Sequence, residues 1–170
     1  MTEADQPSGP FGPPSRVISG GQTGVDRAAL DAARACAIPS GGWCPAGRWA
    51  EDGPIPRRYP LEETATADPA CRTRLNVEEA DGTLILIDGR RDDGTRLTED
   101  AARDLGRPLL VVDLAALPEA EARARIVGWL ADEGIRSLNV AGPRESTAPG
   151  IYRRSRGVLT SVFAARGRRS

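Results

Sequence analysis

Two short runs of apolar residues constrain the fold of this chain more than any other feature. Thr83–Ile87 reads TLILI and Pro108–Asp113 reads PLLVVD, and neither run alternates between apolar and polar positions. A strand that is apolar at successive positions is buried on both faces, which is typical of parallel sheets covered by helices. The two runs therefore predict strands of a parallel sheet with a layer of helices on each side.

Shorter segments complete an alternation of strands and helices. Further strands are predicted at Arg16–Ser19, Gly41–Cys44 and Ser137–Ala141. Helices are predicted at Asp26–Ala37, Arg72–Ala80, Thr98–Leu105, Pro118–Glu133 and Pro149–Ala165. Thr98 is the expected N-cap of its helix, and Gly106 and Gly134 follow two helix ends. This alternation predicts an α/β protein, a single Rossmann-like three-layer domain with a mainly parallel sheet of about five strands.

The chain has the length of one domain with short tails. Of its 170 residues we assign 16–165 to a Rossmann-like ligand-binding domain, 1–15 to a disordered tail and 166–170 to a basic tail. No stretch approaches the roughly 18 apolar residues of a membrane span, and the start lacks the features of a secretory signal. We therefore expect a cytoplasmic protein that does not contact a membrane.

Charge and cysteine content narrow the classes of partner. The net charge is −1, so we expect no nucleic-acid partner. Cys36, Cys44 and Cys71 form no CxxC pair, and the chain has no His to complete a zinc site. We expect reduced thiols and no metal held by protein side chains.

The chain contains no His and no Lys, and all 23 basic residues are Arg. Without His or Lys, Ser-His-Asp catalysis, Schiff-base chemistry and a Walker-A lysine are excluded. Arg favours a bidentate contact with phosphate or carboxylate. The composition of a GC-rich genome is the alternative explanation for most of these Arg residues, so only those beside motifs are interpreted.

The glycine-rich segment Ser19–Asp26 lies between a predicted strand and a predicted helix. Glycines let a ligand approach the backbone amides, and the helix start adds partial positive charge, so this loop predicts a phosphate site. The alternative is a tight turn with an N-cap at Thr23 or Asp26. The loop matches neither the GxGxxG nor the Walker-A pattern. The candidate residues are Gly20, Gly21, Gln22, Thr23, Gly24 and Asp26.

Four more clusters carry candidate ligand contacts, and three of them follow predicted strands. The carboxyl ends of parallel strands meet at one edge of the sheet, where ligands bind. Trp43 and Trp49 could stack on a flat heterocycle, or they could anchor the long loop 45–60, which we expect to be ordered. The alternative for Arg72 and Thr73 is capping of a helix at the surface. For Gly94 and Thr95 it is a flexible hydrophilic loop. For Arg144 it is a buried structural pair with Glu145. The candidates are Trp43, Arg48, Arg72, Thr73, Gly94, Thr95, Gly142, Arg144 and Ser146.

Several blocks, in order, resemble the molybdenum carrier family. They are SGGQTGVDRAALDAA, GGWCPAGRWAEDGPIPRRYPLEET, RTRLNVEEADGTLILIDG, GTRLTED and LNVAGPRES, within about Arg16 to Tyr152. The resemblance implies a Rossmann-like fold related to lysine-decarboxylase-like and DprA-like nucleotide-binding domains. It also implies a homo-oligomer that binds molybdenum cofactor (molybdopterin, a pterin phosphate) as cargo. We expect Gly20, Gly21, Thr23 and Gly24 to hold the phosphate, with Arg48, Arg72 and Arg144 as cationic contacts.

Two other functions remain open at the level of sequence. One is a nucleoside-monophosphate phosphoribohydrolase, an enzyme that would cleave an N-glycosidic bond. The segment Asp93–Glu99 keeps the Gly-Thr and acid of the related PGGxGTxxE loop, which makes Glu99 its candidate catalytic residue. The segment lacks the preceding Pro-Gly-Gly, so we favour a binding protein over an enzyme. The other alternative is a nucleotide-sensing module.

Overall fold

Five parallel strands form the central sheet of the computed structural model, which describes residues 12–164. The strands lie in the order β2-β1-β9-β7-β8, and each neighbouring pair is parallel. The predicted α/β class is therefore confirmed. The strands are β1 (Arg16–Ile18), β2 (Ser40–Gly41), β7 (Gly82–Ile87), β8 (Leu109–Asp113) and β9 (Ser137–Ala141).

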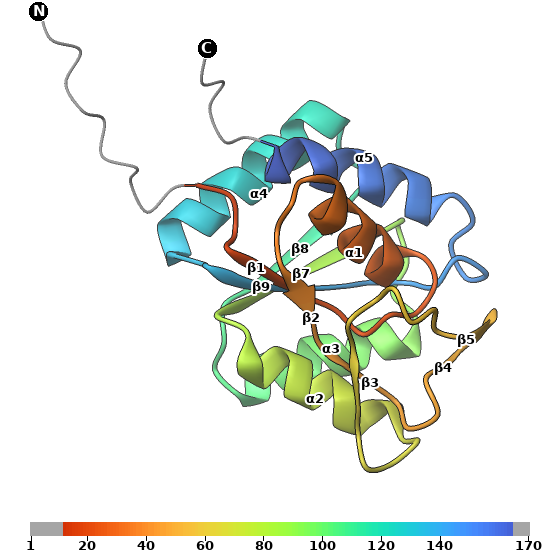
Figure 1. The fold of residues 1–170 in the computed structure, drawn as a ribbon. Helices are drawn as coiled ribbons and strands as arrows, with labels where there is room; N and C mark the ends of the chain where they lie inside the picture. The colour runs from red at the N-terminus through yellow and green to blue at the C-terminus, as the bar shows by residue number, and fades with distance from the viewer. Residues whose placement is uncertain (1–11, 165–170) are drawn as a thin grey trace, which may run out of the picture.

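Helices cover both faces of the sheet, as Figure 1 shows. On one face α5 packs against both α1 and α4, and on the other face α2 packs against α3. The helices are α1 (Val25–Ala35), α2 (Pro69–Glu79), α3 (Asp93–Asp104), α4 (Glu119–Glu133) and α5 (Ile151–Phe163).

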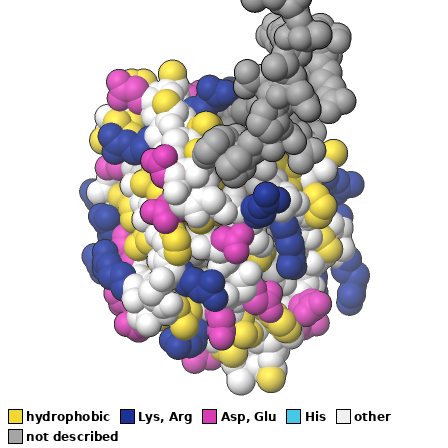
Figure 2. Space-filling model, turned by 90° about the vertical axis from the view of Figure 1, so that its left-hand side faces the viewer, with side chains coloured by type: hydrophobic (Ala, Val, Ile, Leu, Met, Phe, Trp, Pro, Cys, Tyr) yellow, Lys and Arg dark blue, Asp and Glu magenta, His cyan; other side chains and the backbone are white. Residues whose placement is uncertain are grey.

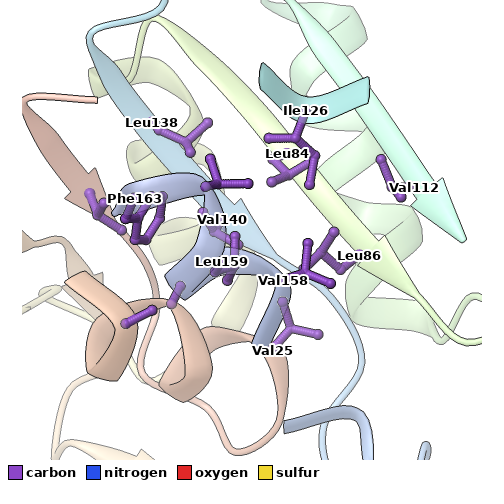
Figure 3. Close-up of a cluster of buried hydrophobic side chains, with 14 of the residues drawn as sticks. Val25, Leu84, Leu86, Val112, Ile126, Leu138, Val140, Val158, Leu159 and Phe163 are labelled. Atoms are coloured by element: carbon purple, nitrogen blue, oxygen red, sulfur yellow. The ribbon is translucent and has the colours of Figure 1, made fainter. Parts of the chain in front are cut away.

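The larger part of the core lies between the sheet and α1, α4 and α5. Leu84 and Leu86 of β7 pack there with Ile126 of α4 and Val158 of α5 (Figure 3). All six residues of β7 are buried, as the uninterrupted apolar run predicted. Burying one Leu or Ile side chain contributes about 1.5–3 kcal/mol, so this two-sided strand is a large part of the fold's stability.

The order of the strands is unusual in one respect. The last strand of the chain, β9, lies at the centre of the sheet between β1 and β7. If the five strands were counted from β9, the order would be 3-2-1-4-5, which is the order of a Rossmann sheet. The protein therefore has a Rossmann sheet whose chain begins at the second strand.

Two predicted elements differ substantially from the structure, and the bounds of most others differ by one to three residues. The strand predicted at Gly41–Cys44 is split, because Gly42 has φ +135° and turns the chain out of the sheet. Its second half, β3 (Trp43–Cys44), pairs instead with β6 (Glu62–Glu63). The helix predicted to begin at Thr98 begins at Asp93.

The early start of α3 has a clear cause. The side chain of Asp92 accepts a hydrogen bond from the Thr95 amide and caps the helix. The expected N-cap at Thr98 is therefore wrong, and the Thr98 hydroxyl donates to the Gly94 carbonyl within the helix. Gly106 and Gly134 do follow helix ends with positive φ, as predicted.

The long loop 45–60, which we call the strap, is ordered by a small hairpin. Its strands β4 (Trp49–Ala50) and β5 (Gly53–Pro54) are antiparallel. Arg48 holds the strap together from inside. Its guanidinium donates to backbone carbonyls of Ile55, Pro56, Tyr59 and Leu61 at 2.9–3.1 Å.

The predicted tails lie largely outside the described residues, which leave out 1–11 and 165–170. Within residues 12–164, no helix has the length and apolar character needed to cross a bilayer. On the face shown in Figure 2, Arg side chains are interspersed with Asp and Glu side chains, so no broad patch of one sign forms there.

Close packing around β9 generates a stability prediction. A Cβ atom at Gly142, just after β9, would lie 2.3 Å from the Leu86 carbonyl oxygen of β7. We expect Gly142→Ala to lower the free energy of unfolding by about 2–4 kcal/mol, because two backbones must separate. Gly128→Ala is the control. It lies in α4 with nothing within 4 Å of its Cβ position, and should raise stability by about 0.5–1 kcal/mol. Denaturant unfolding measures both, and equal stabilities of the two variants would contradict the account.

Candidate functional site

A cleft opens at the carboxyl ends of β1, β9 and β7. The chain leaves β9 toward α5 on one face of the sheet and leaves β7 toward α3 on the other face (Figure 1). Loops that diverge in this way leave a crevice, which is where α/β sheets bind ligands. The cleft has a volume of about 90 Å³. It can therefore admit a headgroup, and a larger ligand would extend out of its mouth.

Seven of the predicted site residues line this cleft. They come from the loops after β1 and β9, from the first turns of α1 and α3, and from α2, so segments far apart in the sequence meet there. The seven are Gln22, Asp26, Arg72, Thr73, Gly94, Gly142 and Arg144.

The other predicted residues do not line the cleft. They support its walls or lie behind them, and they are Gly20, Gly21, Thr23, Gly24, Trp43, Arg48, Thr95 and Ser146, together with the alternative Glu99. Their actual contacts explain why.

The glycine-rich turn is packed more tightly than an open phosphate cradle. The Gln22 amide donates to the Asp26 carboxylate at 3.2 Å, and the Thr23 amide donates to the Gln22 side-chain oxygen at 3.0 Å. A Cβ atom at Gly21 would lie 2.5 Å from the Leu61 side chain. The turn therefore serves mainly to let the strap and other side chains approach closely.

The first turn of α1 also differs from prediction. Its N-cap is Gly24, with φ +79° and no side-chain cap, so neither Thr23 nor Asp26 caps the helix. A Cβ atom at Gly24 would lie 2.4 Å from the Pro143 carbonyl oxygen. Glycine is required here for both reasons, because an L side chain would be strained and would collide with the loop after β9.

Arg72 supplies positive charge to the cleft. Its Nη1 donates to the Gly20 carbonyl at 3.0 Å. Among residues 12–164, no carboxylate lies within ion-pair distance of its guanidinium. A guanidinium has five N–H donors, so Arg72 keeps donors for a ligand, while its charge also acts on the nearby carboxyl of Asp26.

Asp26 is a buried carboxyl group in the wall of the same cleft, with 6% of its surface exposed. Burial raises its pKa from 3.8 to about 6, although the charge of Arg72 and the Gln22 amide oppose the rise. Asp26 therefore changes charge near neutral pH. A buried carboxyl with a strongly shifted pKa in a cleft is a candidate for a functional group.

Two buried amide side chains complete the floor and one wall. Asn139 of β9 is 2% exposed, and its Nδ2 donates to the Thr83 hydroxyl at 3.3 Å. Within the described chain nothing donates to its Oδ1, so this oxygen is available to a ligand hydroxyl or amino group. Asn76 of α2 bonds the backbone N and O of Trp43 at 2.7 and 3.0 Å. Asn76 thereby holds the start of the segment that leads into the strap.

Of the two tryptophans expected near the ligand, only Trp49 lines the cleft. Trp49 lines the mouth of the cleft with 57% of its surface exposed, so its ring is available for stacking. Trp43 is held by Asn76 and does not line the cleft. Arg48, which was expected to bind an anion, instead donates to three strap carbonyls and to the carbonyl of Leu61 just after the strap.

The start of α3 contributes Gly94 to the cleft, and its neighbours have other partners. The Thr95 hydroxyl donates to Asp92 at 2.7 Å. Glu99, the alternative catalytic candidate, is paired with Arg91 at 2.6 Å and does not itself line the cleft.

Thr98, which the sequence placed with Gly94 and Thr95 in a possible second anion cradle, also lines the cleft, whereas Asp92 and Asn139 line it without having been assigned a ligand contact from the sequence. A signal existed for Asn139, because a polar residue interrupts an otherwise apolar strand. Residues 12–164 contain no group of three or more His, Cys, Asp or Glu side chains that could hold a metal ion.

Comparisons with known proteins agree with this geometry. The model of the Circularly permutated YpsA SLOG family matches residues 17–163. The chain also resembles a crystal structure named "Putative molybdenum carrier protein" from Syntrophus aciditrophicus SB, with 44% identity and a TM-score of 0.86. That match covers 90% of this chain and 97% of the other. No curated protein matches the chain. The central position of β9 agrees with a circular permutation, which the name of the family states.

The buried carboxyl of Asp26 generates a pH-dependent stability prediction. The folded state holds the Asp26 proton more tightly than the unfolded state, so ionisation of Asp26 destabilises the fold. This cost in stability is absent at low pH and grows as the pH rises from 3.8 to about 6. Asp26→Asn keeps an acceptor for the Gln22 amide and removes this cost. We expect the variant to be more stable than wild type by about 2–3 kcal/mol at pH ~7.5 and by much less at pH ~4.5.

Denaturant unfolding at the two pH values measures the difference. Asp132→Asn, at an exposed position of α4, is the matched control and should change stability little at either pH. A loss of stability in Asp26→Asn of the same size at both pH values would contradict the assignment.

Proposed function

Because the chain belongs to the Circularly permutated YpsA SLOG family, we propose that it binds a phosphate-bearing small molecule in the cleft. The ligand would be molybdenum cofactor, a pterin phosphate, or a nucleotide. The observation that carries the proposal is the Arg72 guanidinium, which lines the cleft with no carboxylate partner among residues 12–164. Arg forms charge-assisted, often bidentate hydrogen bonds with phosphate.

The rest of the cleft fits a ligand with one anionic end and one flat end. The cleft has room for a phosphate, and Trp49 in its lining offers an exposed aromatic face. Stacking on such a face suits a pterin or a nucleobase alike. The Oδ1 of Asn139 and the carboxyl of Asp26 can accept hydrogen bonds from hydroxyl or amino groups between the two ends.

The relative named as a molybdenum carrier supports molybdenum cofactor as the cargo. In that case the metal arrives within the ligand, and the protein contributes contacts to the pterin and phosphate. A carrier releases its ligand unchanged, which agrees with the position of Glu99 outside the cleft. The phosphoribohydrolase alternative rested on Glu99 and has no specific support here. The homo-oligomer implied by the resemblance stays a prediction.

Equilibrium binding tests the proposal. Native mass spectrometry of the protein purified without denaturation identifies a retained ligand, and calorimetry with molybdenum cofactor and AMP measures affinity. We expect saturable binding without turnover. Arg72→Gln should weaken it at least about tenfold, because a charge-assisted contact to phosphate contributes about 1.5–3 kcal/mol.

The matched control is Arg74→Gln, an exposed position on the same helix, which should bind like wild type. Trp49→Ala should weaken AMP more than inorganic phosphate, because only AMP has a ring to stack. If neither molybdenum cofactor nor AMP binds, or if the two Arg variants weaken binding equally, the proposed function is wrong.

A further inference from the structure

The carboxylate of Glu51, at the tip of the strap, is held like a bound anion. The Thr23 hydroxyl donates to its Oε1, and the Ser146 amide donates to the same oxygen at 3.2 Å. The Ser146 hydroxyl donates to Oε2 at 2.5 Å, and Nη1 of Arg144 lies 3.8 Å from Oε2. Two hydroxyls, a backbone amide and a guanidinium form the set of donors that proteins use to bind phosphate.

These donors belong to the sheet's own loops, whereas Glu51 reaches them from outside. Thr23 follows β1, and Arg144 and Ser146 follow β9. The Thr23 hydroxyl also accepts a hydrogen bond from the Glu145 amide at 3.2 Å, which fixes the two loops against each other. The donor set therefore does not depend on Glu51 for its assembly.

The electrostatics of Glu51 agree with this description. Its side chain is 19% exposed. Burial tends to raise the pKa of Glu51, but hydrogen bonds from Ser146 and Thr23 outweigh it and leave the pKa below its ordinary value. The donor set thus stabilises negative charge on whatever group it holds.

The donor set is also continuous with the cleft. Arg144 lines the cleft, and so does Gln22, whose side-chain oxygen accepts from both the Thr23 and Glu51 amides. The donor set therefore adjoins the cleft through Arg144, whereas Thr23 and Ser146 lie behind the Glu51 carboxylate that they hold. At present this one carboxylate of the chain fills the donor set.

We propose that Thr23, Arg144 and Ser146 form an anion subsite of the cleft, which Glu51 fills in this structure and which a ligand phosphate takes by displacing the Glu51 carboxylate. Displacement releases the tip of the strap beside Trp49 and widens the mouth of the cleft. The inference rests on the proposed function, because it concerns the same ligand and the same cleft.

A purely structural role for Glu51 makes the opposite prediction. If Glu51 only fastens the strap, its loss should loosen the cleft and weaken binding. If Glu51 competes with the ligand, its neutralisation should strengthen binding. The strap has a separate attachment beside Glu51, because Arg27 contacts both carboxylate oxygens of Asp52 at 2.5 and 2.8 Å. A Glu51 variant therefore keeps one fastening of the strap.

The test is calorimetric titration of wild type, Glu51→Gln and Glu51→Ala with inorganic phosphate and with AMP. We expect both variants to bind inorganic phosphate about tenfold more tightly than wild type. Adding Ser146→Ala to Glu51→Gln should remove most of that gain. The control is Glu62→Gln, an exposed position of β6, which should match wild type.

Hydrogen exchange on the wild-type protein provides a second measurement that needs no variant. Saturating inorganic phosphate should speed amide exchange in residues 49–54, because the strap tip is released. Unchanged or slower exchange there would overturn the proposal, as would phosphate affinity in both Glu51 variants equal to or below that of wild type.

The result also separates this inference from the proposed function. Binding of AMP that depends on Arg72 but does not rise in the Glu51 variants overturns only the subsite. Absence of AMP and phosphate binding in wild type and in both Glu51 variants overturns the subsite and also counts against a phosphate-binding cleft.

Discussion

The pairing of β9 between β1 and β7 is the constraint on which the rest of the structure depends. It joins the last strand of the chain to strands more than fifty residues earlier, and it brings three loops to one edge of the sheet. The close approach of Gly142 to the Leu86 carbonyl and of Gly24 to the Pro143 carbonyl follows directly from this pairing. The cleft is therefore a product of strand order, since no single loop could form it.

The buried carboxyl of Asp26 in the wall of the cleft lowers the stability of the folded protein when it is ionised. Asp26 is almost fully buried, and its pKa is raised because the opposing effects of Arg72 and the Gln22 amide do not offset desolvation. Natural proteins lose stability in this way where function requires a particular group. Arg72 and Asp26 give the cleft a cation and an acid whose charge depends on pH near neutrality. Anion binding should be stronger when Asp26 is protonated, because the repulsion of its carboxylate is then absent.

Local sequence patterns predicted the fold, but they predicted only part of the candidate site. The buried runs at Thr83–Ile87 and Pro108–Asp113 predicted their strands because two-sided burial leaves a distinctive composition. The order of the strands could not be predicted, because it depends on long-range pairing. Arg48 shows the limit most clearly. An Arg beside a Gly-rich loop suggested an anion contact, but its donors satisfy carbonyls of the strap. The sequence marks which side chains are unusual, and only the fold determines which of them share a cavity.

The central claim is that the cleft between β9 and β7 holds a phosphate-bearing ligand at Arg72. The most direct measurement is a crystal structure of the protein grown with AMP. The account predicts the phosphate within hydrogen-bond distance of the Arg72 guanidinium, with the adenine ring against Trp49. AMP bound at any other surface, with Arg72 in contact only with the Gly20 carbonyl, would contradict it.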